Sequence, residues 1–476
     1  MPNMSRRKFL GGAIAAAGVG AGAMSASSIV ADLARADAKP LRSLEQIEHV
    51  IFLMQENRSF DSYFGSMSGV RGFSDPNALK LPNGRTVFHQ PAKNAVGYQL
   101  PFHLDTLSEA GGCAFDLDHG WDTQHASWNK GAMDGFVNSR KATDGDYAPY
   151  AMGYYKRADI PFYYELADAF TVADGYHASV IGGTNPNRLY MWSGTIDPSG
   201  KHGGPATNNS ADVPFTWQTY PQRLEAAGIS WQVYQTSDNY TDNALAWFPV
   251  FANAPKDSAL WKRGMAEQPL EAFADDVAGN RLPQVSWLVP PKWWSEHPPF
   301  PPALGMSTTA YYLNVLRNNP ATWAKTAVFL VYDENDGYFD HVRPPTPPPG
   351  TPGEFIKGQP IGLGFRVPMI AISPWSQGGW VTSQTFDHTS LIQFMEKRFG
   401  VEEPNITQWR RKTCGDLVGC FDFASANTNF PILRKTMKDT VNQVNKCNSA
   451  PIVPVPIVQH MPEQDTMPFR RKRATQ

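Results

Sequence analysis

The chain has 476 residues, with 42 Lys and Arg against 44 Asp and Glu, and a formal net charge of −2. No basic field is available for a polyanion, so we expect no nucleic-acid partner. Aromatic residues make up 12% of the chain, and Pro (40) and Gly (39) are abundant. This composition excludes a disordered chain and suits a large globular protein with long ordered loops.

The N-terminus has the pattern of a twin-arginine export signal. Arg6 and Arg7 precede a mildly apolar Gly/Ala stretch at residues 11–24, and a small-x-small cleavage site lies at residues 36–38. Residues 1–38 are therefore predicted to be a signal peptide read by the twin-arginine export machinery, which delivers the protein to the periplasm, the cell wall or the medium. No other stretch approaches 18 apolar residues, so we expect no transmembrane segment in the mature protein.

The first predicted strand is an apolar run at residues 47–54, of the kind that is buried on both faces of a sheet. Glu56 and Asn57 follow it and offer two oxygen ligands that hard or borderline divalent cations accept. The alternative is a helix N-terminus, with Asn57 or Ser59 as the cap and Asp61 in the first turn. Both interpretations can hold together.

Residues 66–160 are predicted to be rich in loops, and a helix and a strand are expected over residues 160–173. Within the loops, His119 and His125 are candidate metal ligands or phosphate contacts. A single histidine is more often only a core or surface residue, so spacing alone assigns neither.

A Gly-Gly turn at residues 182–183 precedes Thr184, where a helix can start, with Pro186 in its first turn. A hydroxyl at a helix N-terminus lies among free backbone N–H groups, which suits a bound phosphate. The alternative is that Thr184 is only the N-cap. Arg188 falls one turn later, where its guanidinium could reach an anion.

Two further strands are predicted at residues 229–234 and 282–289. The second leads into a proline-rich loop that carries His297. Because this histidine lies just past a strand, it is a better ligand candidate than His89 or His202.

The stretch of residues 327–341 has the most marked pattern in the chain. A short apolar run at residues 327–332 predicts another buried strand. Four carboxylates and a histidine follow within nine residues: Asp333, Glu334, Asp336, Asp340 and His341. Such charges repel one another unless cations or donors balance them, and ligand sites form at this end of strands in α/β sheets. We therefore predict a metal or phosphate site rather than the alternative, a solvated acidic turn.

The last regular elements are a strand at residues 367–374 and an amphipathic helix that starts near Asp387 and ends at Gly400. Hydrophobic periodicity is lost beyond about residue 430. Of the four cysteines, Cys414 and Cys420 are expected to form a disulfide in an exported protein, the alternative being isolated thiols.

Taken together, these stretches resemble the exported bacterial phospholipase C and acid phosphatase group of the alkaline-phosphatase-like superfamily. The matching segments follow the family's order between about residues 45 and 425: 47–65, 182–190, 285–291, 295–298, 332–342, 362–368 and 386–394. The resemblance implies an α/β fold with a doubly wound, mostly parallel sheet flanked by helices. It places a catalytic domain at residues 39–430 and a partly mobile extension at 431–476, in a short form without the C-terminal β-domains of longer members.

The resemblance also implies roles for individual residues. Thr184 would be the nucleophile, where phosphatase members carry Ser. The implied ligands of a divalent metal ion are Glu56, Asn57, Thr184, Asp333 and Glu334. The implied phosphate-facing histidines are His119, His297 and His341. Oxygen-rich ligands favour Ca, Mg or Mn, and carboxylate-bound Zn stays open.

Phosphoester cleavage needs a nucleophile, stabilisation of the phosphate oxygens and an acid for the leaving alkoxide. Metal coordination would lower the pKa of the Thr184 hydroxyl, and His297 or His341 would protonate the leaving diacylglycerol. The expected function is an exported phospholipase C that hydrolyses phospholipids at a membrane surface. The alternatives are a broad acid phosphatase, acting on phosphomonoesters, and an exported binding protein without turnover.

Tryptophans near the candidate histidines suggest a headgroup preference. Trp293 and Trp294 lie shortly before His297, and Trp121 lies two residues after His119. Aromatic rings attract a quaternary ammonium by roughly 0.5–2 kcal/mol each, which favours phosphatidylcholine as the substrate. The alternative is that these tryptophans are core or membrane-contact residues.

Overall fold

A computed structural model describes residues 43–113, 115–209 and 214–473. Its centre is an eight-stranded sheet with the strand order β14-β13-β6-β12-β9-β1-β8-β7. The bounds are β1 His49–Gln55, β6 Thr171–Ala173, β7 Trp231–Gln235, β8 Val285–Val289, β9 Thr326–Tyr332, β12 Met369–Ile372, β13 Trp380–Thr382 and β14 Arg471–Lys472. Among these strands only β12 is antiparallel to its neighbours, β6 and β9. The predicted mostly parallel sheet is confirmed.

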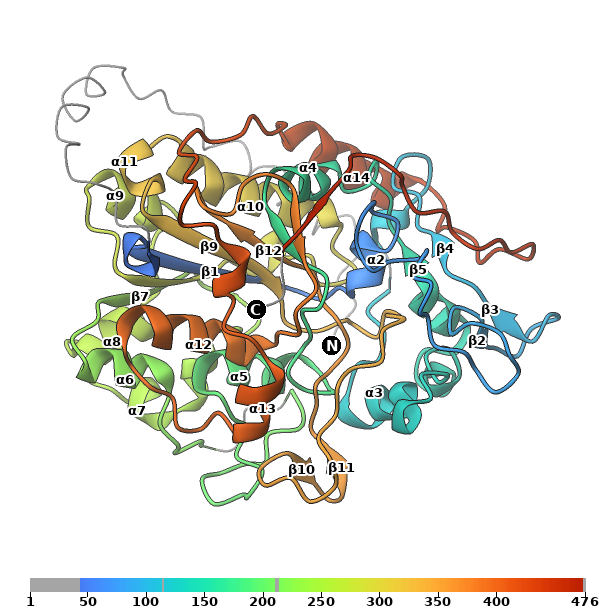
Figure 1. Ribbon diagram of the computed structural model, residues 1–476, viewed down its shortest axis with the longest axis horizontal. Helices are drawn as coiled ribbons and strands as arrows, with labels where there is room; N and C mark the ends of the chain where they lie inside the picture. Colours follow the sequence, from blue (N-terminus) through green and yellow to red (C-terminus); the bar gives the residue numbers. More distant parts are fainter. Residues whose placement is uncertain (1–42, 114, 210–213, 474–476) are drawn as a thin grey trace.

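Helices cover both faces of this sheet (Figure 1). Helices α5, α6, α7, α8, α12 and α13 lie on one side, and α4, α9, α10, α11 and α14 lie on the other. Their bounds are α4 Pro161–Ala169, α5 Thr184–Ser193, α6 Tyr220–Ala226, α7 Pro249–Ala252, α8 Ala259–Gly264, α9 Ala272–Ala278, α10 Pro302–Arg317, α11 Pro320–Trp323, α12 His388–Phe399, α13 Gln408–Thr413 and α14 Met437–Ser449. The predicted doubly wound α/β architecture is therefore confirmed.

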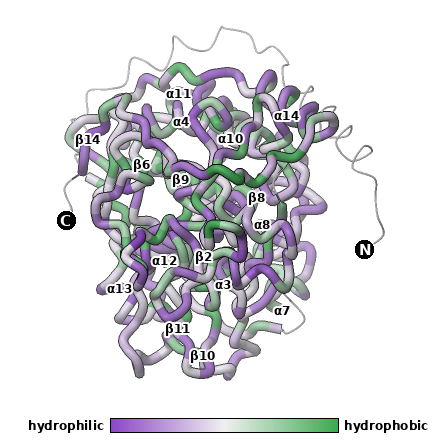
Figure 2. The backbone as a smooth tube through the Cα atoms, turned by 90° about the vertical axis from the view of Figure 1, so that its right-hand side faces the viewer, coloured by the Kyte–Doolittle hydropathy of each residue, from purple (hydrophilic) through white to green (hydrophobic). Residues whose placement is uncertain are grey.

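The sheet is the hydrophobic core of the protein. Every residue of β8 and β9 is buried, and Figure 2 shows hydrophobic stretches along both strands. These are the apolar runs from which the strands were predicted, and burial on both faces explains why they are continuous rather than alternating. The predicted strands near residues 47, 229, 282, 327 and 367 and the helix ending at Gly400 are all present.

The region between β1 and α4 is rich in loops, as predicted, and wraps one end of the sheet. It contains α2 Phe60–Phe64, α3 Trp121–Trp128, several 3-10 turns and the two-residue strands β2 Gln90–Pro91, β3 Tyr98–Gln99, β4 Phe102–His103 and β5 Gly153–Tyr154. Outside this region, β10 Phe355–Ile356 and β11 Gln359–Pro360 pair as a small separate hairpin. Ser59 caps α2 by accepting a hydrogen bond from the N–H of Ser62 at 3.1 Å, so the capping interpretation was right for Ser59.

The C-terminal segment is anchored to the rest of the chain. α14 packs against α10, and β14 pairs with β13 at the edge of the sheet. The buried guanidinium of Arg470 donates to the carboxylate of Asp168. The boundary near residue 430 and the mobility of the extension stay predictions. The predicted signal peptide lies outside the described residues. Within the described chain, no helix combines the length and the apolar character needed to cross a membrane.

The expected disulfide between Cys414 and Cys420 is wrong. The structure joins Cys113 to Cys447, 334 residues apart, and leaves the other two cysteines as buried free thiols. The thiol of Cys414 lies near Asp387 and Arg410, whereas that of Cys420 lies near Arg473. Closeness in sequence did not bring them together, because each thiol points into different surroundings.

Replacing Cys113 and Cys447 by serine is expected to lower the free energy of unfolding by about 2–5 kcal/mol, because the bridge closes a long loop in the unfolded chain. Thermal unfolding with and without a reductant measures this. The reductant should lower the Tm of the wild type and leave the Tm of the double variant unchanged. An equal Tm for the wild type in both conditions would contradict the prediction.

Candidate active site

Two adjacent parallel strands deliver the polar residues of the site to one edge of the sheet. Gln55 at the end of β1 is in register with Tyr332 at the end of β9. Glu56 and Asp333 are the next residues, so their carboxylates emerge side by side. Both side chains are at most 1% exposed, as are Asn57 and Glu334. Four of the five predicted metal ligands, Glu56, Asn57, Asp333 and Glu334, therefore lie together as one buried group, and the fifth, Thr184, stays a prediction.

Several oxygen atoms of this group lack hydrogen-bond donors among the described residues. They are Asn57 Oδ1, Asp333 Oδ2 and Glu334 Oε1, and the neighbouring Asp336 has one more such atom, Oδ2. A buried polar atom without a partner costs free energy, and a buried carboxylate costs more. A divalent cation would satisfy these oxygens and balance their charge, so the residues present fit a metal ion.

Helix α5 carries Thr184 and Arg188 to the acidic group. Residues four apart lie on the same face of a helix, so the side chain of Thr184 and that of Arg188 share one face. The guanidinium of Arg188 is 2.7 Å from Glu56 Oε1 and 3.3 Å from Asp333 Oδ2. It also lies 3.1 Å from Asp242, a residue that the sequence did not single out. Arg188 is thus held by carboxylates, and its predicted contact with the substrate stays a prediction.

Thr184 is the first residue of α5, and Gly183 is the N-cap. A Cβ atom on Gly183 would lie 3.2 Å from the ring of His119, a tighter contact than most Cβ atoms make, so glycine favours the close approach of this turn to the histidine. The Thr184 side chain is 7% exposed. The interpretation of Thr184 as the N-cap is wrong, because the cap falls one residue earlier.

His119 and His297 both direct Nε2 toward a carboxylate, and Nδ1 of His119 also faces one, since it lies 3.3 Å from Asp336 Oδ1. In each ring Nδ1 lies 2.7 Å from a backbone carbonyl, Leu117 O for His119 and Pro298 O for His297. Nε2 of His119 lies 3.6 Å from Glu334 Oε1, and Nε2 of His297 lies 3.9 Å from Glu56 Oε2. A carbonyl on Nδ1 fixes the ring and directs Nε2 toward a ligand.

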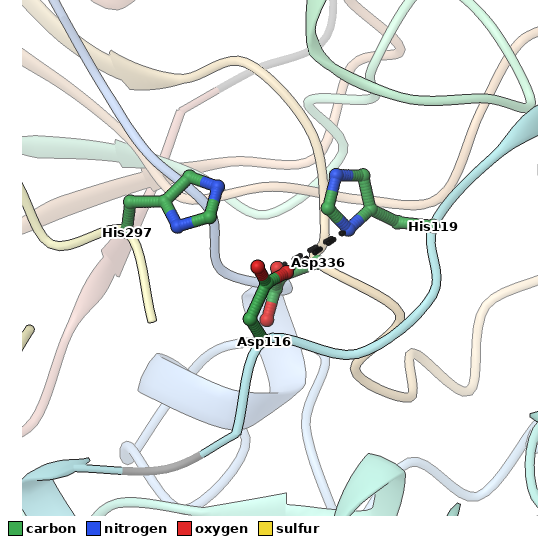
Figure 3. Close-up of side chains that lie close together, drawn as sticks. All are labelled: Asp116, His119, His297 and Asp336. Atoms are coloured by element: carbon green, nitrogen blue, oxygen red, sulfur yellow. Dashed lines mark ion pairs between the residues drawn. The ribbon is translucent and has the colours of Figure 1, made fainter. Parts of the chain in front are cut away.

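Figure 3 shows both rings beside Asp116 and Asp336. Ligand atoms of these two histidines and two aspartates all lie within 4.8 Å of one another, so this cluster could hold a metal ion. Asp336 also links it to the first group, because Asn57 Nδ2 donates to Asp336 Oδ1 at 3.5 Å. The sequence pattern contained Asp336, and Asp116 comes from the same loop as the candidate His119, three residues before it.

The electrostatics of the site call for added positive charge. Burial, together with neighbouring carboxylates, raises the pKa of Asp333 to about 7 and raises the pKa of Glu334 and Asp242 well above the usual range. Burial opposes the charge on His119, but Glu334 and Asp336 outweigh it and raise its pKa well above the usual value. The carboxylates therefore carry their negative charges at a cost unless positive charge balances them, so the group favours binding of a cation.

The structure places His341 apart from this group. Its Nδ1 is 2.6 Å from Asp61 Oδ2 and its Nε2 is 3.3 Å from Asp75 Oδ2, and the ring is buried. Arg366 and Asp340 complete this ion network. Both nitrogens are thus occupied, and no contact among the described residues joins His341 to the carboxylates around Glu56. Its predicted role near the phosphate stays a prediction.

The predicted aromatic residues divide into two kinds. Trp293 packs against a small cluster of Phe300, Leu304 and Val444, and the ring of Trp294 lies 6.0 Å from that of Tyr311. Their contacts match the alternative of core packing.

Trp121 lies nearer the site, because a Cβ on Gly182 would come 3.8 Å from its ring. The sequence missed Tyr240, whose ring stacks on His297 at 5.2 Å and is 40% exposed. Substrate contacts for all of these rings stay predictions.

A model of the Phosphoesterase family matches residues 47–402 of this chain. The chain is 44% identical over 506 residues to the non-hemolytic phospholipase C of Pseudomonas aeruginosa, covering 100% of this chain and 71% of the relative. It is 42% identical over 508 residues to phospholipase C A of Mycobacterium tuberculosis, covering 98% and 97%.

Among solved structures, the chain is similar to a protein in the alkaline phosphatase superfamily from Vibrio parahaemolyticus. The TM-score is 0.36 and the identity is 10%, covering 91% of this chain and 81% of that one.

Proposed function

The chain belongs to the Phosphoesterase family, and on that premise we propose that it is an exported phospholipase C with Thr184 as its nucleophile. The observation that carries the proposal is the buried acidic group at the ends of β1 and β9, which helix α5 contacts through Arg188. The names of relatives that cover almost the whole chain support the activity.

We assign the metal ion to Glu56, Asn57, Asp333 and Glu334, with the hydroxyl of Thr184 beside it. A divalent cation held there would lower the pKa of that hydroxyl and stabilise charge on the phosphate oxygens. The unsatisfied oxygens of Asn57, Asp333 and Glu334 support this set. All donors are oxygens, which suits Ca, Mg or Mn and leaves carboxylate-bound Zn open.

The side chains of this site can then support hydrolysis in two steps, each of them a displacement at phosphorus. The Thr184 hydroxyl gives its proton to solvent water and takes one back when its oxygen leaves phosphorus in the second displacement. In the first displacement the Thr184 oxygen forms a bond to phosphorus, and the bond from phosphorus to the glycerol oxygen breaks. His297 gives its Nε2 proton to that leaving oxygen, so diacylglycerol departs. A water molecule, deprotonated by His297, next displaces the Thr184 oxygen and releases the phosphorylated headgroup. Imidazolium His119 donates a hydrogen bond to a phosphate oxygen throughout.

One assay tests the proposed function against its alternatives. Purified protein is incubated with phosphatidylcholine in detergent micelles and with p-nitrophenyl phosphate, each with and without a chelator. Release of diacylglycerol that the chelator abolishes is the expected result. Faster hydrolysis of p-nitrophenyl phosphate would favour the acid phosphatase, and no turnover of either compound would favour the binding protein.

The rim of the site favours a cationic headgroup. The exposed ring of Tyr240 stacks on His297, and the ammonium of Lys292 already lies 6.0 Å from its centre. The carboxylates of Asp116 and Asp238 are about half exposed beside it. An aromatic face with nearby anions attracts a quaternary ammonium, so we propose phosphatidylcholine as the substrate.

Replacing Tyr240 by alanine is expected to lower the preference for phosphatidylcholine over phosphatidylglycerol by about two- to thirtyfold, since one cation–π contact contributes roughly 0.5–2 kcal/mol. Competition between the two lipids measures the ratio of kcat/KM values. Trp294→Ala is the matched control, because its ring packs against Tyr311, and it should keep the wild-type preference. A preference that changes only in Trp294→Ala would contradict the prediction.

A further inference from the structure

Glu296 has a buried carboxylate that the proposed reaction does not use. Its side chain is fully buried, and three tyrosine hydroxyls donate to it. The donors are Tyr63 to Oε2, Tyr163 to Oε1, and Tyr332 to Oε1 at 2.9 Å. An ionised carboxylate only accepts hydrogen bonds and has about four acceptor positions, so it can satisfy all three donors at once. No neutral side chain of this length can do so.

The three tyrosines come from elements that surround the active site. Tyr63 is in α2, which starts four residues after Glu56. Tyr332 is the last residue of β9 and precedes Asp333 directly. Tyr163 is in α4, which lies on the face of the sheet opposite to α5. The carboxylate of Glu296 therefore ties the end of β9, and the helix α2 that follows β1, to the loop that carries His297.

Besides the three tyrosines, helix α10 also packs against the Glu296 side chain. A Cβ atom on Gly305 would lie 2.0 Å from Oε1 of Glu296 and 2.2 Å from its Cγ. Glycine is unfavourable inside a helix by roughly 0.5–1 kcal/mol relative to alanine. Its presence in the first turn of α10 lets the helix backbone pack directly against the side chain, so α10 and the three tyrosines together fix the position of Glu296.

Because Glu296 and His297 are adjacent, a fixed Glu296 side chain limits where the His297 ring can lie. Pro298 O and the stacked ring of Tyr240 orient the imidazole itself, whereas Glu296 fixes the adjacent backbone from which this partly exposed side chain projects. Burying a carboxylate costs several kcal/mol unless donors compensate it, and apolar residues could fill the same space without that cost. A role in packing alone therefore does not account for an acid here.

We propose that Glu296 is a positioning residue, which holds the His297 loop so that Nε2 of His297 faces the substrate phosphate. This inference rests on the proposed function, since it needs His297 to act on the leaving group. It assigns to Glu296 and its three tyrosines no contact with substrate or metal.

The test is a double-mutant cycle with phosphatidylcholine as the substrate, using Glu296→Gln, His297→Asn and the double variant. Loss of a supporting hydrogen-bonded group near a reactive centre typically costs about 10–100-fold in activity. We expect Glu296→Gln to lower kcat by that factor with KM nearly unchanged. If Glu296 acts through His297, the double variant should be no less active than His297→Asn.

A multiplicative loss in the double variant, or full kcat in Glu296→Gln, would overturn the inference. Full activity in His297→Asn would instead overturn the role of His297 in the proposed function, so the two failures are distinguishable.

Two milder variants keep the test decisive if Glu296→Gln does not fold. Gly305→Ala leaves the carboxylate intact and displaces it, and a shift of about 1 Å can cost up to 10²-fold in rate. Tyr163→Phe removes one of the three donors and should lower kcat less than Gly305→Ala does. The matched control is Tyr220→Phe, which deletes a buried hydroxyl bonded to Val401 O and should leave kcat unchanged. Equal kcat in all three variants would overturn the proposal.

Discussion

Thr184→Ala is expected to lower kcat on phosphatidylcholine by at least about a thousandfold, because loss of a nucleophile removes the covalent route altogether. Arg188, on the same face of α5, keeps its three carboxylate partners in this variant, so the fold and the metal content should not change. Initial rates of diacylglycerol release measure the effect. Circular dichroism and elemental analysis check the fold and the bound metal.

Two comparison variants make this result specific. Thr184→Ser keeps a hydroxyl at the start of the helix and should retain part of the activity. Thr216→Ala removes an exposed threonine hydroxyl that bonds only to His202, and it should behave as the wild type. A Thr184→Ala protein with more than a tenth of wild-type activity would contradict the covalent mechanism.

Asp333→Asn and Glu56→Gln are expected to lose the bound metal together with at least about a hundredfold in kcat, because each removes an anionic ligand from a buried set. The metal content per chain, measured by elemental analysis after dialysis, should fall in both variants. Asp146→Asn is the control, since Asp146 is fully exposed and paired only with Lys141. Unchanged metal content in Asp333→Asn would contradict the assignment.

The stability of Asp333→Asn separates a ligand role from a structural one. Burial and the neighbouring carboxylates raise the pKa of Asp333 to about 7, so its charged form is unfavourable in the metal-free protein. We therefore expect the Tm of the metal-free variant to equal or exceed that of the metal-free wild type. A large drop in Tm would mean that Asp333 acts mainly through its pairing with Arg188.

Much of the fold could be predicted because its central strands are buried on both faces. Continuous apolar runs such as those of β8 and β9 are typical of strands that helices cover on each side, so they identified the strands, whereas the doubly wound fold class came from the resemblance to a known family. The order of the strands and the antiparallel direction of β12 depend on tertiary packing, for which a single strand carries no signal.

The local pattern predicted site residues that directly follow a strand, and the family resemblance added His119, which lies in a loop. Glu56 and Asp333 come next after β1 and β9, and the register of a parallel pair brings them together. Asp116, Asp242 and Tyr240 come from long loops, and nothing in the local pattern indicates where such loops fold.

His341 shows that closeness in sequence to the acidic stretch does not by itself place a residue in the site. It follows the acidic stretch closely in sequence, yet the chain turns away after Gly337, and Asp61 and Asp75 hold the ring in a separate buried network.

The central claim is that Thr184 becomes covalently attached to phosphorus during turnover, and the most direct test is to trap that adduct. Protein turning over phosphatidylcholine is quenched in acid, digested and mapped by mass spectrometry. The account predicts phosphocholine linked to the peptide that contains Thr184, and no such adduct in Thr184→Ala. Turnover without any adduct on quenching, or an adduct on a different residue, would contradict it.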